Sequence, residues 1–205
     1  MNNGVIKTGS LQNGRENLPE RSLISRLDTA RGVLQKWTPA QFLEVHNPDV
    51  GTAIVREGYT CGRLSLNESI PTLANDAEEY GDATVIAWLR IQLDAVDRVL
   101  GAKAMGELER YDAARLIYAK YRDMNVANLL QFFARYRLGE YTEATERIAG
   151  VQKILTALKL YNVACNDDAR RLEREREMQK GYEQRLEWEK KAVSYEEWVK
   201  TRDNE

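Results

Sequence analysis

The chain holds one histidine, His46, which stands directly before Asn47-Pro48-Asp49. A neutral imidazole can act as a general base, and a Ser-His-Asp or Cys-His arrangement would depend on this one residue. An Asn-Pro pair is typical of a turn or of the start of a helix. We therefore expect His46 to pack or cap at the end of a helix and to take no part in catalysis.

Asp94 and Asp97 lie one helical turn apart and are the best candidates for a metal pair, because paired carboxylates can bind two metals for phosphodiester chemistry. Arg90 and Arg98 each lie four residues from Asp94, at the spacing of ion pairs along a helix. A solvated ribbon of Arg90, Asp94, Asp97 and Arg98 explains these residues better than a metal site.

Cys61 and Cys165 are far apart in the sequence, and neither has a second Cys or His at ligand spacing. This spacing argues against zinc and against a disulfide framework, so both thiols are expected to be reduced. The chain also lacks the GxxxxGK[ST], GxGxxG, HExxH, GxSxG and CxxC motifs. We expect no enzyme, with no catalytic residue, no cofactor and no metal.

Two helices with a three-residue turn are predicted within 107–138, and the part at 111–138 has the size of a helix-turn-helix. In the second helix Leu130 and Phe133 are predicted to face inward, which leaves Phe132 and the polar residues outward. Arg, Asn and Gln can pair with base edges, and Arg and Tyr suit phosphate contact and stacking. The candidate nucleic-acid-binding residues are Arg115, Tyr118, Arg122, Asn128, Gln131 and Arg135. An ordinary packed hairpin with a solvated face is the alternative.

The elements that would position these residues are predicted to be helical throughout, because no segment alternates apolar and polar residues in the manner of a strand. A long apolar helix over about 82–104 is expected at the centre of an irregular multi-helix bundle, with Asp82 as its cap. Short helices are expected after Thr38, after Asn47 and after Ser69, and an irregular stretch between Gly58 and Gly62. The fold class is therefore all-α.

Three segments are expected along the chain. Residues 1–19 are rich in Asn and Gly and form a disordered arm. Residues 20–165 form the helical core domain, and residues 166–205 form a charged, solvent-exposed helical extension. The seam of the last helix meets Asp168, Glu175 and Gln179 where a coiled coil needs apolar residues, so at most a weak homodimer is expected.

The composition is that of a globular protein: 205 residues, 43% hydrophobic and 30% charged, with a net charge of -2. A net charge this small creates no global field to hold nucleic acid or an anionic membrane. The first residues have neither the signal-peptide nor the transit-peptide pattern. We expect a cytoplasmic location and no membrane contact.

The segment AARLIYAKYRDMNVANLLQFFARYRLGEY, the later ILTALKLY and the upstream IPTLANDAEEYG resemble a group of uncharacterised helical proteins encoded by phages and conjugative elements of gut bacteria. The likeness covers residues 50–175 and departs at TEATERIAG after Tyr141. The matching positions are Tyr121, Leu129, Leu130, Phe132, Phe133, Arg135, Gly139 and Tyr141. The resemblance implies a mobile-element setting, in a bacterial host cell or on a virion, and no activity.

Two functions are compatible with these observations. The first is a non-enzymatic adaptor or assembly protein that acts through contacts with a protein partner, for which the charged last helix is the motivating feature. The second is a nucleic-acid-binding accessory of replication or regulation that uses the hairpin at 111–138.

Overall fold

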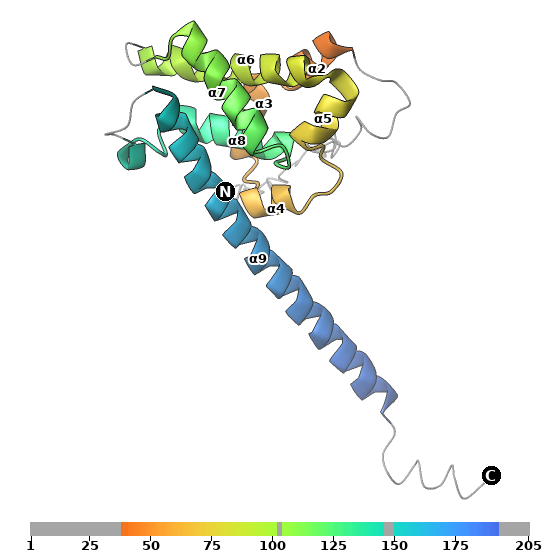
Figure 1. Cartoon of the computed structure of the whole chain (residues 1–205). Helices are drawn as coiled ribbons and strands as arrows, with labels where there is room; N and C mark the ends of the chain where they lie inside the picture. The colour runs from red at the N-terminus through yellow and green to blue at the C-terminus, as the bar shows by residue number, and fades with distance from the viewer. Residues whose placement is uncertain (1–37, 102–103, 146–149, 193–205) are drawn as a thin grey trace, which may run out of the picture.

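The computed structural model describes residues 38–101, 104–145 and 150–192, and every regular element within these ranges is a helix (Figure 1). The all-α class and the long C-terminal helix are confirmed. A single isolated bridge joins Thr72 to Asn125 in the described part of the chain. The expected arm at 1–19 and residues 193–205 of the expected extension lie outside the described residues.

The first two helices begin where their capping signals predict. Helix α2 (Pro39–Val45) follows a capping box in which the Gln41 amide nitrogen donates to Thr38 Oγ1 and the Thr38 amide nitrogen donates to Gln41 Oε1. Helix α3 (Pro48–Arg56) begins after Asn47, whose side chain accepts from the Asp49 amide nitrogen. Local side-chain chemistry is therefore sufficient to start both helices.

Two short helices precede the long central one. Helix α4 (Cys61–Ser65) includes Gly62, so the expected irregular stretch is wrong at its C-terminal end. The reason is the hydroxyl of Thr60, which caps α4 by accepting from the Arg63 amide nitrogen. Helix α5 (Leu73–Tyr80) is capped by Thr72, three residues beyond the predicted Ser69.

Helix α6 (Asp82–Leu100) is four residues shorter than predicted, because Gly101 turns the chain with a φ of 58°. Asp82 is its first residue and not its cap, since the cap position belongs to Gly81 and the Asp82 carboxylate accepts the hydroxyl of Tyr118 at 2.5 Å. Most of the expected polar ribbon lies at the surface. Asp97 is the exception and is buried.

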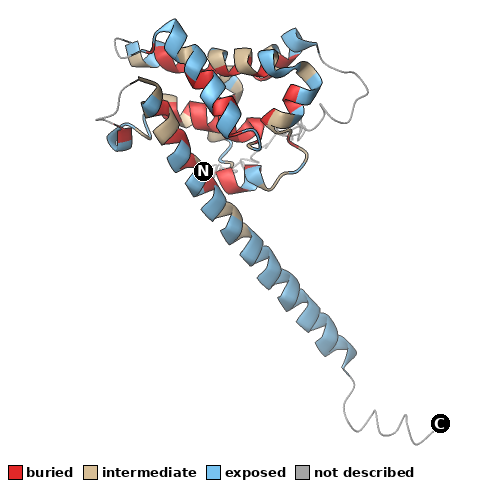
Figure 2. Ribbon diagram, viewed as in Figure 1, coloured by how far each residue is buried: buried red, intermediate tan, exposed pale blue. Residues whose placement is uncertain are grey.

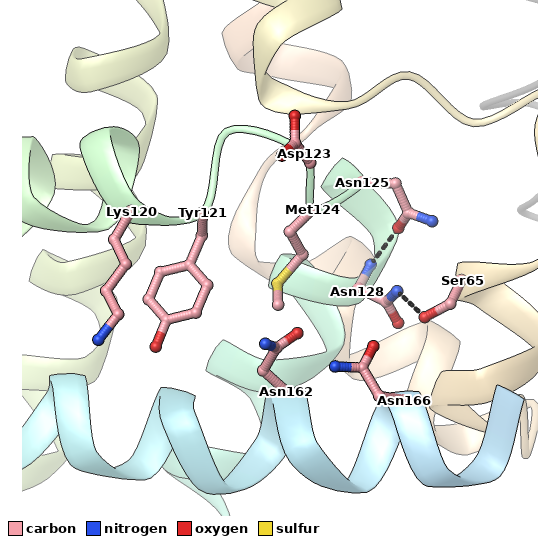
Figure 3. Close-up of a pocket in the computed structure, with 9 residues that line it drawn as sticks. All are labelled: Ser65, Lys120, Tyr121, Asp123, Met124, Asn125, Asn128, Asn162 and Asn166. Carbon is pink, nitrogen blue, oxygen red and sulfur yellow. Dashed lines mark hydrogen bonds between the residues drawn. The ribbon is translucent and has the colours of Figure 1, made fainter. Parts of the chain in front are cut away.

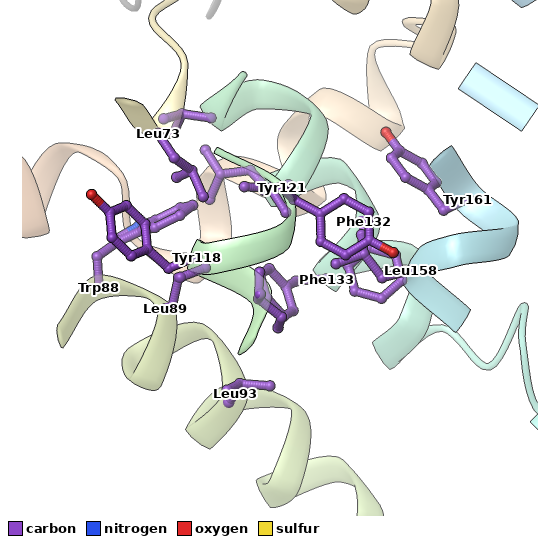
Figure 4. Packing of buried hydrophobic residues seen from close by; sticks show 14 of the residues in the cluster. Leu73, Trp88, Leu89, Leu93, Tyr118, Tyr121, Phe132, Phe133, Leu158 and Tyr161 are labelled. Carbon is purple, nitrogen blue, oxygen red and sulfur yellow. The ribbon is translucent and has the colours of Figure 1, made fainter. Parts of the chain in front are cut away.

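Helices α7 (Glu107–Lys120) and α8 (Val126–Arg137) form the predicted hairpin, and α8 is enclosed more completely than α6. Ten of its twelve residues are buried, against eight of nineteen in α6. Helices α3, α4, α6 and α9 all pack against α8. Figure 4 shows Phe132 and Phe133 of α8 in one cluster with residues from α6, α7 and α9.

Helix α9 (Gly150–Lys191) follows the short 3₁₀ helix η2 (Glu143–Thr145) and runs out of the globule. Its first part buries Ile154, Leu158, Tyr161 and Cys165, as the apolar pattern predicts. Beyond Leu172 every described residue is exposed (Figure 2). The helix therefore belongs to the core at one end and to solvent at the other.

Two glycines permit the closest helix approaches. A Cβ atom on Gly51 would lie 2.2 Å from the Leu130 carbonyl oxygen, and one on Gly62 would lie 2.6 Å from the Ala169 amide nitrogen. Both contacts are with backbone atoms, which cannot move aside as a flexible side chain can. Glycine is therefore required where α3 crosses α8 and where α4 meets α9.

None of the described helices combines the length and the apolar character needed to cross a membrane.

The substitution Leu93→Ala tests the burial of α6. Leu93 has no exposed surface, so its loss should lower the free energy of unfolding by about 2–5 kcal/mol, the usual range for an emptied aliphatic site. Val99→Ala, on the same helix but 60% exposed, is the matched control and should change stability by less than about 0.5 kcal/mol. Urea denaturation of both variants measures the difference, and equal small shifts would contradict the described packing.

Candidate functional site

The candidate nucleic-acid-binding residues of α7 and of the turn that follows it are only partly accessible. Arg115 and Arg122 are exposed, and phosphate contact through them stays a prediction. Tyr118 is 8% exposed, its hydroxyl donates to Asp82, and the guanidinium carbon of Arg122 lies 5.3 Å from its ring centroid. The expectation that Tyr118 offers a free stacking face is therefore wrong, because its ring is already covered.

The expected outward face of α8 is also wrong. Asn128, Gln131 and Phe132 are buried, because helices pack around α8 on every side and leave it no solvated face. Arg135 is half-buried and its guanidinium lies 3.5 Å from the Glu140 carboxylate. Asn128 and Gln131 therefore do not lie on an outward face, and base contact through Arg135 stays a prediction.

The two buried amides of α8 are held in a hydrogen-bond network that ties three helices together. The Tyr161 hydroxyl of α9 lies 2.8 Å from Gln131 Oε1 and 3.1 Å from Asn128 Oδ1, and its proton can go to either oxygen. The Asn128 side-chain nitrogen donates to Ser65 Oγ, and the Gln131 side-chain nitrogen donates to the Tyr59 carbonyl oxygen. Both side-chain nitrogens thus have an acceptor, and the two amide oxygens share the single hydroxyl proton of Tyr161.

Beside this network a polar pocket of about 390 Å³ opens between the end of α4, the turn from α7 to α8, and α9 (Figure 3). A volume of this size is typical of a small-ligand site. Amide side chains dominate its walls. The lining residues are Ser65, Lys120, Tyr121, Asp123, Met124, Asn125, Asn128, Asn162 and Asn166.

The four asparagines of the pocket divide into two kinds. Asn125 and Asn128 are used by the fold: Asn125 accepts from the Asn128 amide nitrogen and donates to the Leu64 carbonyl oxygen. Asn162 and Asn166 extend from α9 toward the pocket in Figure 3, and neither side chain has a hydrogen-bond partner within the described residues. Sequence reasoning missed this pair, although its spacing of four residues is a recognisable signal for one helix face.

The opposite wall adds a hydroxyl and a cation. Tyr121 is 7% exposed, and burial raises the pKa of its hydroxyl above the usual range, so the group keeps its proton. The Lys120 ammonium lies 5.7 Å from the Tyr121 ring centroid, and both side chains point toward α9 (Figure 3). The pocket therefore offers hydrogen-bond donors and acceptors and two charges at its edge: the Lys120 ammonium is directed toward α9, and the Asp123 carboxylate is directed away from it (Figure 3).

A carboxylate of α9 holds this helix against α4 next to the pocket. Asp168 Oδ2 accepts from the Gly62 amide nitrogen at 3.0 Å, and Asp168 pairs with Arg171 on the solvent side. Hydrogen bonds from Thr60, Arg171 and Gly62 lower the pKa of Asp168 below its usual range. The point where α9 leaves the core is thus fixed to the first turn of α4.

Cys61 of α4 and Cys165 of α9 lie together at the same contact, which their sequence positions do not reveal. Both thiols are free and buried. A hydrogen bond from Cys165 lowers the pKa of Cys61 to about 7, and the same contact raises the pKa of Cys165. The thiols thus form a buried pair at the α4–α9 contact.

His46 packs at the end of α2, as expected. Its ring lies 4.6 Å from the Phe42 ring, and Nδ1 lies 3.0 Å from the Phe42 carbonyl oxygen, so Nδ1 carries a proton. The His46 carbonyl oxygen accepts from Trp88 Nε1 and Gln92 Nε2. Both ring and backbone therefore serve the packing of α2 on α6.

The carboxylates of α6 are also engaged in structure. Asp94 pairs with Arg98, as the spacing predicts. The buried Asp97 instead accepts from the Met105 amide nitrogen and from Arg110, each at 2.9 Å, and so ties α6 to the start of α7. Within the described ranges no three His, Cys, Asp or Glu side chains gather as a metal-binding group.

Comparison with protein-family models, with curated proteins and with solved structures finds no match.

Tyr161→Phe tests the network on α8. Removal of the hydroxyl takes away the one proton that the buried amide oxygens of Asn128 and Gln131 share, which should cost about 1–3 kcal/mol of unfolding free energy. Tyr182→Phe removes the same group from a 62% exposed tyrosine of the same helix and should leave stability unchanged. Chemical denaturation followed by circular dichroism gives both values, and an unaffected Tyr161→Phe variant would show that the network contributes nothing.

The buried imidazole predicts a loss of stability in mild acid. Burial lowers the pKa of His46 from 6.5 to about 4, so the unfolded chain takes up the proton before the folded one does. Stability should be complete above the unfolded pKa and fall as the pH drops from about 6.5 to about 4. The loss between about pH 7.5 and about pH 5 should be about 2 kcal/mol.

His46→Gln removes the only imidazole of the chain and is the control for this pH dependence. Its unfolding free energy should change much less between the same two pH values, because carboxylates titrate mainly below them. If the unfolding free energies of wild type and variant change equally with pH, the pH dependence comes from groups other than His46.

Proposed function

We propose that the protein is a non-enzymatic helical adaptor or assembly protein, which contacts a protein partner through the solvated half of α9. The observation that carries this proposal is the length of that half. A continuous helix runs from Asp167 to Lys191 with no packing against the core beyond Leu172. At 1.5 Å per residue this segment reaches about 37 Å beyond the pocket.

The charge pattern of this segment supports a stable free helix. Residues 167–191 hold eight basic and eight acidic side chains, so opposite charges meet at helical spacing. Arg170 lies 4.0 Å from Asp167 and the Gln179 side chain donates to Glu183. Such a helix can persist without a tertiary partner and present its side chains at a distance from the core.

Large apolar side chains on the segment provide the contact surface. Met178 is 68% exposed, Tyr182 62% and Trp188 71%, within a segment in which most side chains are charged. Tyrosine and tryptophan are the residue types that contribute most to binding energy at protein interfaces. Their exposure on a largely charged helix therefore favours a protein partner over a purely solvated role.

The adaptor function is better supported than nucleic-acid binding for two reasons. The balanced charge of 167–191 attracts no polyanion, and the amides proposed to meet base edges are buried in α8. The resemblance of residues 50–175 to proteins of phages and conjugative elements supports a role in a phage or mobile-element assembly, in the host cytoplasm or on the virion. The partner is then a component of that assembly or a host protein.

The double substitution Tyr182→Ala with Trp188→Ala tests the adaptor function. Affinity capture by the full chain, from cells that produce it naturally, should recover a protein partner whose yield falls at least about tenfold with the variant. Quantitative mass spectrometry measures the yield. Gln179→Ala with Gln184→Ala, on the same exposed helix, is the matched control and should recover the partner as wild type does.

Equal recovery by wild type and by the Tyr182 and Trp188 variant would contradict the proposed use of α9. Recovery of nucleic acid in place of protein would favour the alternative function.

A further inference from the structure

The strongest unassigned feature is the pair of amides that α9 extends into the polar pocket. Asparagine is a poorer helix former than alanine by several tenths of a kcal/mol per residue, so Asn162 and Asn166 each cost helix stability. Asn125 is the N-cap of α8, where asparagine is favoured, and Asn128 offsets its cost with a hydrogen bond to Ser65, whereas the α9 pair has no hydrogen bond within the described residues. Asn162 is half-buried and Asn166 is exposed, so both amides are free to meet a ligand at the pocket.

The spacing of the pair matches one kind of ligand closely. Four helical residues advance by about 6 Å, and two residues of an extended chain advance by about 6.6 Å. In an extended chain, residues i and i+2 present their N–H and C=O groups to the same side. Each asparagine amide carries one acceptor and one donor group, so two amides one turn apart can each pair with both backbone groups of alternate residues.

The rest of the pocket adds polarity and charge to this arrangement. The Tyr121 hydroxyl lies across from α9 and can donate to a backbone carbonyl oxygen or accept from an N–H. The Lys120 ammonium at the pocket edge favours an acidic side chain or a terminal carboxylate beside it. A neutral oligosaccharide could also use the amides, but it carries no negative charge for Lys120.

We infer that the pocket binds an extended, acidic peptide segment of a protein partner, with Asn162 and Asn166 pairing to the backbone of two alternate peptide residues and Lys120 facing an acidic group. The inference rests on the proposed adaptor function only in that the ligand is a protein segment. It does not depend on Tyr182 or Trp188. Main-chain pairing supplies the affinity, and the charge beside Lys120 supplies selectivity.

The experiment is selection of a displayed library of random heptapeptides on the purified full chain. Peptides are counter-selected on the double variant Asn162→Ala with Asn166→Ala, which folds because alanine favours the helix. Circular dichroism and the thermal midpoint confirm the fold of each variant. The enriched peptide is then synthesised and its affinity is measured by fluorescence anisotropy.

The enriched peptides should carry Asp or Glu, and the double asparagine variant should bind the synthetic peptide at least about tenfold more weakly than wild type. Lys120→Ala should weaken binding several-fold and reduce its salt dependence. Gln152→Ala, which removes an exposed amide of α9 outside the pocket, should have no effect.

N-methylation of the peptide backbone tests the backbone pairing separately, because it removes a backbone N–H donor and leaves every side chain unchanged. Methyl groups on the two alternate residues that meet the amides should abolish binding, and a methyl group on the residue between them should be tolerated. Equal tolerance at all three positions would overturn the backbone pairing.

Selection of no peptide that depends on the two asparagines would overturn the inference, as would asparagine-dependent retention of an uncharged oligosaccharide or an oligonucleotide instead. The variant Tyr182→Ala with Trp188→Ala should bind the selected peptide as wild type does. Failure of the proposed use of α9 is thereby distinguishable from failure of the pocket proposal.

Discussion

The burial of two amide side chains on α8 is the constraint on which the rest of the structure depends. An unpaired buried amide costs folding free energy, so Asn128 and Gln131 can be enclosed only where partners meet them. Those partners come from three separate places: Tyr161 of α9, Ser65 of α4 and the carbonyl group of Tyr59. One set of bonds therefore sets how α4 and α9 lie against α8, and with them the shape of the pocket.

Most helix boundaries were predictable because their causes lie within four residues. The side chains of Thr38 and Asn47 accept from amide nitrogens two or three residues later, and such caps can be recognised without knowledge of the fold. The apolar spacing of α9 likewise separates its packed start from its charged end. Local chemistry is thus enough for the all-α class and for the long last helix.

The orientation of α8 and the composition of the pocket were not predictable in the same way. Helical periodicity places Asn128 and Gln131 on a polar face, and only the four surrounding helices turn that face into an interior. Asp97 shows the same effect, because its partner Arg110 lies on another helix. The contact between Cys61 and Cys165 also depends on how α4 docks on α9.

Because α9 is one continuous helix, its exposed end is connected directly to the end that packs in the core. The helix is held against α4 where Asp168 accepts from the Gly62 amide nitrogen and where the glycine permits close backbone contact. No break in the helix separates this point from Lys191. If this outer part of α9, about 37 Å long, tilts by about 10°, its far end moves by about 6 Å. Asn162 and Asn166 lie on the same continuous helix as this far end, so a tilt of the whole helix moves the pocket wall and the far end together.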